Sequence, residues 1–219
     1  MTAQDLQRLA QKKSIRTADR AVVVEVPLAD ERQSGATDEQ APAETVRESH
    51  KVQATLVRVG AEMGFRIWVP RSDRQKVLSE VPHDLHSAFL EILPLNYDDT
   101  TLRTVEQIDV IWLKGRSMAR AFEVEHTTAI YSGILRMADL LALQPNMDIR
   151  LHIVAPDDKR DKVLREIRRP VFSLLDRGPL YESCSYLSYE AVREISEMRF
   201  LGHMSDSIIE EYEEFAQDE

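Results

Sequence analysis

One stretch, residues 107–143, constrains the fold more than any other, because it joins two strand patterns to a helical one. Residues 107–113 form a short, nearly continuous apolar run that only Asp109 interrupts. Such a run is typical of a strand covered on both faces, where an unpaired charge is costly to bury. After a Lys-Gly-Arg-Ser turn, a second strand pattern ends at Glu125. We therefore expect two adjacent strands, and Asp109 needs a cation, hydrogen-bond donors or the open edge of a cleft.

Three carboxylates fall on these two predicted strands. Because side chains alternate across a strand, Glu123 and Glu125 share one face, about 6.5–7 Å apart. Pairing of the strands as a hairpin would bring Asp109 to the same face. Three carboxylates held together repel one another and raise their own pKa values unless a cation neutralises them. A hard divalent ion such as Mg²⁺, which prefers oxygen ligands, is the natural occupant.

The residues after Glu125 predict an amphipathic helix. Thr127 or Thr128 would cap its N-terminus, directly after His126. The core face has the spacing i, i+4, i+7, i+8 and i+11 and consists of Ile130, Ile134, Met137, Ala138 and Leu141. Another face, which could meet a ligand or only water, carries Ser132, Arg136 and Asp139.

At these residues the chain resembles the PD-(D/E)xK nuclease superfamily, the fold of many restriction endonucleases and repair nucleases. The motif of that superfamily is a strand Asp followed, on the next strand, by Glu-x-Lys. Asp109 and the run Glu123-Val124-Glu125 match this pattern, with Glu125 in the usual place of Lys. The segments FEVEHTTAIYSGILRMADLLALQPN and IVAPDDKRDKV are similar to a group of bacterial restriction-endonuclease-like proteins. The resemblance extends over about residues 50–172.

The resemblance implies a DNA endonuclease that depends on Mg²⁺, for which Mn²⁺ can substitute. Asp109 and Glu123 would then hold the metal, with the carbonyl of Val124 as a further ligand, and Glu125 would act as general base. Accessory roles are expected among Gln53, His126, Ser132 and Arg136. Because superfamily members often dimerise to cut both strands, a homodimer is expected at family level.

The patterns outside this stretch predict further elements in a consistent order. Helices are expected over residues 45–63, 85–92, 159–168 and 190–198, and strands over 65–69, 148–154 and 183–189. The resulting order contains the αβββαβ core of the superfamily, an α/β fold whose mixed central sheet is flanked by helices. We expect this domain to cover residues 45–200, followed by an acidic helix or tail over 201–219.

The first 44 residues are expected to be a partly flexible extension. Residues 1–20 could form a short helix and 21–28 a short strand, whereas 29–44 are polar, acidic and rich in turn formers, as in a linker. The sequence contains no apolar stretch long enough to span a bilayer and lacks the apolar segment of a secretory signal, so we expect a cytoplasmic protein. One cysteine, Cys184, excludes an intrachain disulfide.

Charge is distributed unevenly along the chain. The formal net charge of −10 argues against indiscriminate nucleic-acid binding but allows a local basic cleft. Residues 159–169 are strongly basic and could either contact DNA phosphates or be solvated. The candidate phosphate contacts are Lys159, Arg160, Arg168 and Arg169.

Three alternatives to a metal-dependent nuclease remain open on sequence grounds. Glu123 or Glu125 could form a structural ion pair with Arg116, Arg120 or Arg136. A nuclease fold could also have lost cleavage and serve as a DNA-recognition or assembly subunit, as Glu125 in place of Lys would suggest. The acidic balance and the polar extension also fit a non-catalytic interaction protein.

Overall fold

The computed structural model describes residues 10–17, 20–27, 43–125 and 130–216, with side chains from residue 47 onward. The chain divides into two compact units, Met1–Gln40 and Ala41–Glu219. The first unit contains two antiparallel strands, β1 (Ala10–Thr17) and β2 (Arg20–Pro27). The expected strand over 21–28 is confirmed, but the expected helix is wrong for residues 10–17. A valine-rich strand leaves backbone groups unpaired, and the preceding segment satisfies them as a second strand.

The second unit is built on a mixed five-stranded sheet with the strand order β3-β4-β5-β6-β7. Its strands are β3 (Arg66–Trp68), β4 (Val110–Lys114), β5 (Ser117–Val124), β6 (Arg150–Ala155) and β7 (Cys184–Ser188). The first three pair antiparallel, and β5, β6 and β7 pair parallel. The β4–β5 hairpin turns at Gly115, whose φ of 62° suits a residue without a Cβ. The predicted hairpin is therefore confirmed.

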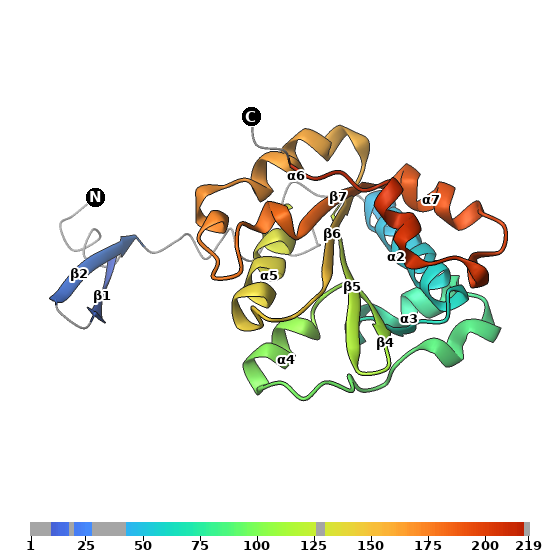
Figure 1. Cartoon of the computed structure of the whole chain (residues 1–219), viewed down its shortest axis with the longest axis horizontal. Coiled ribbons are helices and arrows are strands. Elements are labelled where there is room, and N and C mark those ends of the chain that lie inside the picture. The colour runs from blue at the N-terminus through green and yellow to red at the C-terminus, as the bar shows by residue number, and fades with distance from the viewer. Residues whose placement is uncertain (1–9, 18–19, 28–42, 126–129, 217–219) are drawn as a thin grey trace. The chain divides into compact units, whose positions relative to one another are not determined.

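Helices cover both faces of this sheet (Figure 1). They are α2 (Ala43–Glu62), α3 (Arg71–Glu80), α4 (Asp99–Val105), α5 (Ile130–Leu143), α6 (Arg160–Ile167) and α7 (Tyr189–Glu197). On the α2 and α7 face, Val57 packs with Trp112 and Phe122 of the sheet. On the α5 face, Ile134 packs with Ala121 and Ile153. An α/β unit with a mixed sheet between helices is thus confirmed.

Two helices between β3 and β4 were not predicted. Helix α3 buries only Val77, so it has no apolar stripe that the sequence could reveal. Helix α4 begins at a cap in which Asp98 accepts from the backbone N–H groups of Thr100 and Thr101. Because α4 and the turn after it reach residue 109, β4 begins at Val110, and the prediction of a strand from residue 107 is wrong at its start.

The expected helix over residues 85–92 is also wrong. A 3₁₀ helix, η2 (His83–Ala88), occupies its first half. Phe89 then forms an isolated bridge to Ile67, and the N–H of Leu90 donates to the carbonyl of Ile67. The chain here adds backbone pairing at the β3 edge, which outweighs the weak local preference of a short segment between two prolines.

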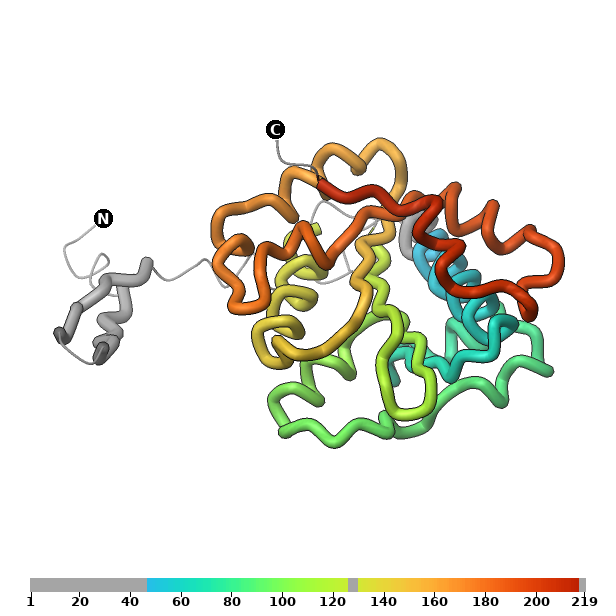
Figure 2. The backbone as a smooth tube through the Cα atoms, in the orientation of Figure 1, coloured from blue at the N-terminus to red at the C-terminus, as the bar shows by residue number. Residues whose placement is uncertain are grey.

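The end of the described chain runs from the α7 side of the sheet to the α6 side, as the red segment in Figure 2 shows. It contains the 3₁₀ helices η6 (Leu201–His203) and η7 (Asp206–Glu211), and Ile209 lies in the α2-side core. Glu214 then pairs with Tyr186 of β7. The remaining 3₁₀ helices are η3 (Asp157–Lys159), η4 (Pro170–Ser173) and η5 (Leu180–Glu182).

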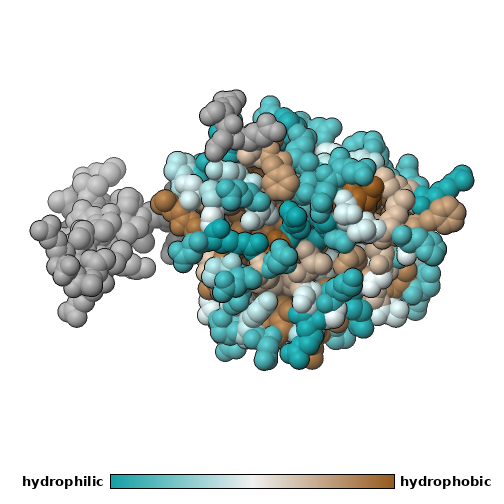
Figure 3. All heavy atoms as spheres, in the orientation of Figure 1, coloured by the Kyte–Doolittle hydropathy of each residue, from teal (hydrophilic) through white to brown (hydrophobic). Residues whose placement is uncertain are grey.

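The surface of the second unit is mainly hydrophilic in the view of Figure 3, with separate apolar areas. Cys184 is fully buried in β7, and burial raises the pKa of its thiol. Within the described ranges, none of the helices combines the length and apolar character that crossing a bilayer requires.

Candidate active site at the end of β5

The three predicted carboxylates meet where the antiparallel half of the sheet joins the parallel half. Val110 pairs with Phe122, so the same register places Asp109 beside Glu123. Asp109 Oδ2 accepts a hydrogen bond from the backbone N–H of Val124 at 2.8 Å. The next N–H, that of Glu125, donates to the carbonyl of Val154 and continues the pairing with β6. Backbone pairing of β5 on both sides thus fixes the position of the motif.

Glu123 is the most deeply buried carboxylate of the site, with 2% of its surface exposed. Burial raises its pKa well above the usual range, and the charge of Asp109 adds to this effect. Arg136 opposes the rise through charge and a hydrogen bond, and Glu125 contributes a smaller increase. Glu123 Oε1 is buried and has no hydrogen-bond partner among the described residues. This buried oxygen therefore lacks a hydrogen-bond donor in the part of the chain that the structure describes.

Arg136 of α5 compensates part of the charge of Glu123 through its other oxygen. Its Nη1 donates to Glu123 Oε2 at 2.5 Å and to the carbonyl of Gln107 at 3.1 Å. Burial alone would lower the pKa of Arg136, but the charge of Glu123 raises it instead. The structural ion pair considered from the sequence is thus present, and Arg136 forms it. Arg116 instead donates to the carbonyl of Pro94.

Glu125 is partly buried at the first turn of α5. Its Oε1 accepts from the backbone N–H of Gly133 at 3.1 Å. This end of a helix favours nearby negative charge. Tyr189 donates from its hydroxyl to the carbonyl of Glu125 at 3.2 Å, and burial raises the pKa of that hydroxyl.

Gly133 is a site residue that sequence reasoning missed. A Cβ at this position would lie 2.5 Å from Glu125 Oε1 and 3.2 Å from Glu123 Cβ. The absence of a side chain is what lets α5 approach the carboxylates. A glycine inside an amphipathic helix directly after the Glu-x-Glu run was the available signal. Tyr189 lies 64 residues from Glu125 and gave no such signal.

The accessory candidates are distributed unevenly around this site. Ser132 and Arg136 line a hollow between α4 and α5. Gln53 lies on α2, where its Oε1 is buried without a hydrogen-bond partner in the described part of the chain. His126 and the two threonines predicted as helix caps fall outside the described residues.

Among the candidate phosphate contacts, ion pairs are described for Arg160, Lys159 and Arg169. Arg160 binds Glu214 through Nε at 2.9 Å and also through Nη2. Lys159 Nζ lies 3.0 Å from Asp158 Oδ2, and Arg169 Nε lies 2.7 Å from Glu166 Oε2. Arg168 lines, with Arg160 and Arg169, a groove of about 1030 Å³ beside the end of the described chain. These pairs are partly exposed, so each is expected to contribute little to stability.

The donor set suits a hard divalent cation in its chemistry. All side-chain donors are oxygens, and one of them, Glu123 Oε1, has no hydrogen-bond partner among the described residues. Burial raises the pKa of Glu123, the neighbouring carboxylates add to this rise, and Arg136 compensates it in part. Among the described residues, no group of three or more His, Cys, Asp or Glu side chains is already arranged as a metal cage. Arg136 occupies Glu123 Oε2, so a cation could bind at Oε1 or displace Arg136 from Oε2.

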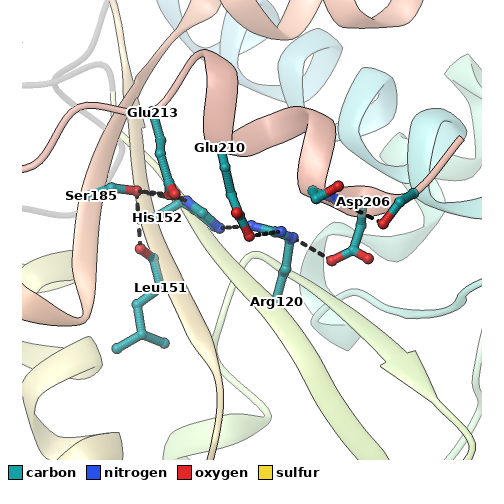
Figure 4. Close-up of polar contacts among 9 residues, drawn as sticks. Arg120, Leu151, His152, Ser185, Asp206, Glu210 and Glu213 are labelled. Atoms are coloured by element: carbon teal, nitrogen blue, oxygen red, sulfur yellow. Dashed lines mark hydrogen bonds and ion pairs between the residues drawn. The ribbon is translucent and has the colours of Figure 1, made fainter.

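Figure 4 shows a second polar cluster. It lies on the opposite face of the sheet, where His152 stacks on Phe122 of the α2-side core. Arg120 Nη1 lies 3.3 Å from His152 Nε2, and because Arg only donates, this nitrogen is the acceptor. His152 Nδ1 then donates to Ser185 Oγ at 2.8 Å, and Ser185 donates to Glu213 Oε2 at 2.8 Å. Burial lowers the pKa of His152, in agreement with a neutral ring.

Arg120 also binds two carboxylates of η7. Its Nε lies 2.7 Å from Asp206 Oδ2, and its Nη2 lies 3.2 Å from Glu210 Oε1. His152 and Ser185 have no exposed surface, and Arg120 has 2%. A Ser-His-Glu arrangement with no access for a substrate cannot act as a hydrolase triad. The cluster instead ties the segment around η7 to the middle of the sheet.

The comparisons with known proteins concern one family. The family described as the type II restriction enzyme NmeDI C-terminal domain matches residues 26–216. A relative, the type II restriction enzyme NmeDI of Neisseria meningitidis serogroup C, is 34% identical over 152 residues, which are 66% of this chain. The aligned part spans 41% of that relative's length. No solved structure matches the chain significantly.

Proposed function

The chain belongs to the family of the type II restriction enzyme NmeDI C-terminal domain, and on this premise we propose that it is a nuclease that hydrolyses DNA phosphodiester bonds. Its cofactor would be Mg²⁺, with Mn²⁺ as a substitute. The observation that carries the proposal is the buried Glu123, which lies beside Asp109 and Glu125 on a sheet junction and has one oxygen without a hydrogen-bond partner among the described residues. The finer fold assignment, to the PD-(D/E)xK superfamily, is part of the same proposal.

In the proposed reaction Asp109 and Glu123 would hold the cation, with the carbonyl of Val124 as a further ligand. A bound divalent cation would stabilise charge on the phosphoryl group and lower the pKa of the attacking water. Glu125 would orient that water as an acceptor and take its proton on a carboxylate oxygen. Its contact with the N–H of Gly133 holds the carboxylate toward the site.

Arg136 would have two roles in this mechanism. In the protein without a cation it compensates the charge of Glu123. When a cation takes over that compensation, the guanidinium would be available for a phosphate oxygen. Arg136 would thereby supply the positive charge that, in the superfamily pattern, comes from a lysine at the position of Glu125.

The first test needs no knowledge of the DNA sequence recognised. Thermal unfolding is measured with and without millimolar Mn²⁺ for the wild type, Asp109→Asn and the control Asp84→Asn, whose side chain is exposed on η2. Asn at position 109 keeps an acceptor for the N–H of Val124, so it removes charge with little effect on backbone pairing. Binding to the native state should raise the midpoint of the wild type and Asp84→Asn, but not of Asp109→Asn.

A cleavage assay on mixed genomic DNA then separates binding from catalysis. Glu123→Gln and Glu125→Gln should abolish Mg²⁺-dependent cleavage, whereas Asp84→Asn should retain it. A Mn²⁺ response that survives in Asp109→Asn would contradict the assignment of the metal site. If a homodimer acts on both strands, as expected at family level, sedimentation should show twice the chain mass on DNA.

A second function is favoured by the Arg136–Glu123 ion pair. This pair already compensates the carboxylate, as a structural site would. The protein would then recognise DNA, or assemble with another subunit, without cutting. Binding of DNA together with no response to Mn²⁺ would select this function.

A further inference from the structure

A hollow of about 250 Å³ lies between α4 and α5, beside the candidate active site. Its lining includes Arg103 and Thr104 from α4, and Ser132 and Arg136 from α5. Arginine side chains donate to nucleic-acid phosphates, whereas the hydroxyl of Thr104 already donates to the carbonyl of Thr100. We infer that this hollow binds one phosphate of the DNA backbone, next to the bond whose hydrolysis is proposed above. The inference rests on that proposed function and adds a substrate contact to it.

The size of the hollow limits what can occupy it. Pockets for drug-sized ligands usually measure about 300–1,000 Å³. At about 250 Å³, this hollow is smaller than such pockets and is large enough for a single tetrahedral anion. The lining also contains two arginines and one carboxylate, that of Asp139, and one of the arginines, Arg136, is at the same time paired with Glu123.

Arg136 connects the hollow to the carboxylates. Its Nη1 contacts Glu123 Oε2 at 2.5 Å and the carbonyl of Gln107, while the residue also lines the hollow. A phosphate bound in the hollow would therefore contact the same arginine side chain that contacts Glu123.

Arg103 and Asp139 provide a test with opposite signs. Both are exposed at the hollow, and neither contributes to the Arg136–Glu123 pair. Burial raises the pKa of Asp139, so its charge is already partly desolvated where an anion would sit. Removing the positive charge should weaken phosphate binding, and removing the negative charge should strengthen it.

The experiment measures binding of a fluorescein-labelled mixed-sequence DNA duplex by the full chain in EDTA, so that no cleavage is needed. The titration begins at low salt because the chain has a net charge of −10. Arg103→Gln should weaken binding about twofold to fivefold and reduce the slope of log K against log salt by about 0.9. Asp139→Asn should tighten binding by a similar factor. The control is Arg199→Gln, an exposed arginine beyond α7, which should match the wild type.

Several outcomes would overturn the inference. These are equal losses in Arg103→Gln and Arg199→Gln, unchanged binding in both hollow variants, or no DNA binding by the wild type. The thermal midpoint of each variant is measured on the same samples. A midpoint equal to that of the wild type shows that a change in DNA binding does not come from unfolding. Opposite shifts in a protein that never cleaves would support the hollow and contradict the nuclease. Cleavage that depends on Asp109, without the shifts, would support the nuclease and contradict the hollow.

Discussion

Arg136 Nη1 lies 2.5 Å from Glu123 Oε2 and so joins α5 to the buried end of β5. The two residues are only 13 positions apart, yet a tight helix approach at Gly133 is needed to bring them together. Glu123 is 2% exposed and Arg136 is 25% exposed, so one partner of the pair is desolvated far more than the other. Because water can solvate Arg136 but not Glu123, loss of the guanidinium should destabilise the protein more than loss of the carboxylate.

Arg136→Met is expected to destabilise the protein, because it leaves Glu123 buried beside Asp109 without its guanidinium. Breaking a fully buried pair costs about 3–5 kcal/mol, and partial exposure of Arg136 lowers our expectation to about 2–3 kcal/mol. Denaturant unfolding of both single variants and of Glu123→Gln/Arg136→Met would give a coupling energy of about 1–3 kcal/mol. Arg199→Met serves as the exposed control. Additive effects would show that the pair contributes nothing.

Stability should depend on the protonation of Glu123. Its pKa is raised above the ordinary value of 4.5, so between the two values the folded state binds more protons than the unfolded state. The stabilising contribution is therefore complete below pH 4.5 and is lost as pH rises through the raised pKa. The free energy of unfolding of the wild type should fall relative to Glu123→Gln over this window, by up to about 1.4 kcal/mol per pH unit. A difference that is flat with pH would contradict the prediction.

Gly133→Ala should separate function from stability. Alanine favours a helix by about 1 kcal/mol over glycine, but its Cβ would meet Glu125 Oε1 and approach Glu123 Cβ. The flexible carboxylate can move away, so we expect a free energy of unfolding within about 1 kcal/mol of the wild type. The displaced Glu125 should nevertheless reduce Mg²⁺-dependent cleavage at least tenfold. Full activity in this variant would show that the position of Glu125 is unimportant.

His152 should make stability sensitive to acid. Burial lowers its pKa below the ordinary value of 6.5, so the unfolded state binds more protons between the two values. The stabilising contribution is present above pH 6.5 and is lost as pH falls through this window. In His152→Asn that loss should be smaller, whereas the exposed His203→Asn should behave as the wild type. Identical acid profiles in all three proteins would contradict the directed Arg120–His152–Ser185 chain.

Much of the candidate site could be predicted because its residues are neighbours in sequence. Alternation placed Glu123 and Glu125 on one face, and a tight turn made the β4–β5 hairpin the simplest pairing. The register of that hairpin, however, shifts by one residue between Trp112 and Leu113, and this shift, which the turn does not encode, brings Asp109 opposite Glu123. Apolar periodicity likewise predicted α2 and α5.

Tertiary structure decided which charges meet. Arg120, predicted as a candidate partner of the carboxylates, lies on the opposite sheet face and pairs with Asp206 and Glu210, 86 and 90 residues away. Helices α3 and α4 escaped prediction because they bury too few apolar residues to show a stripe. Sequence alone determined the local elements and the shared face of the carboxylates, since backbone geometry and burial act over a few residues. The choice of Arg136 for Glu123, and the hollow between α4 and α5, depended on long-range packing that no local pattern encodes.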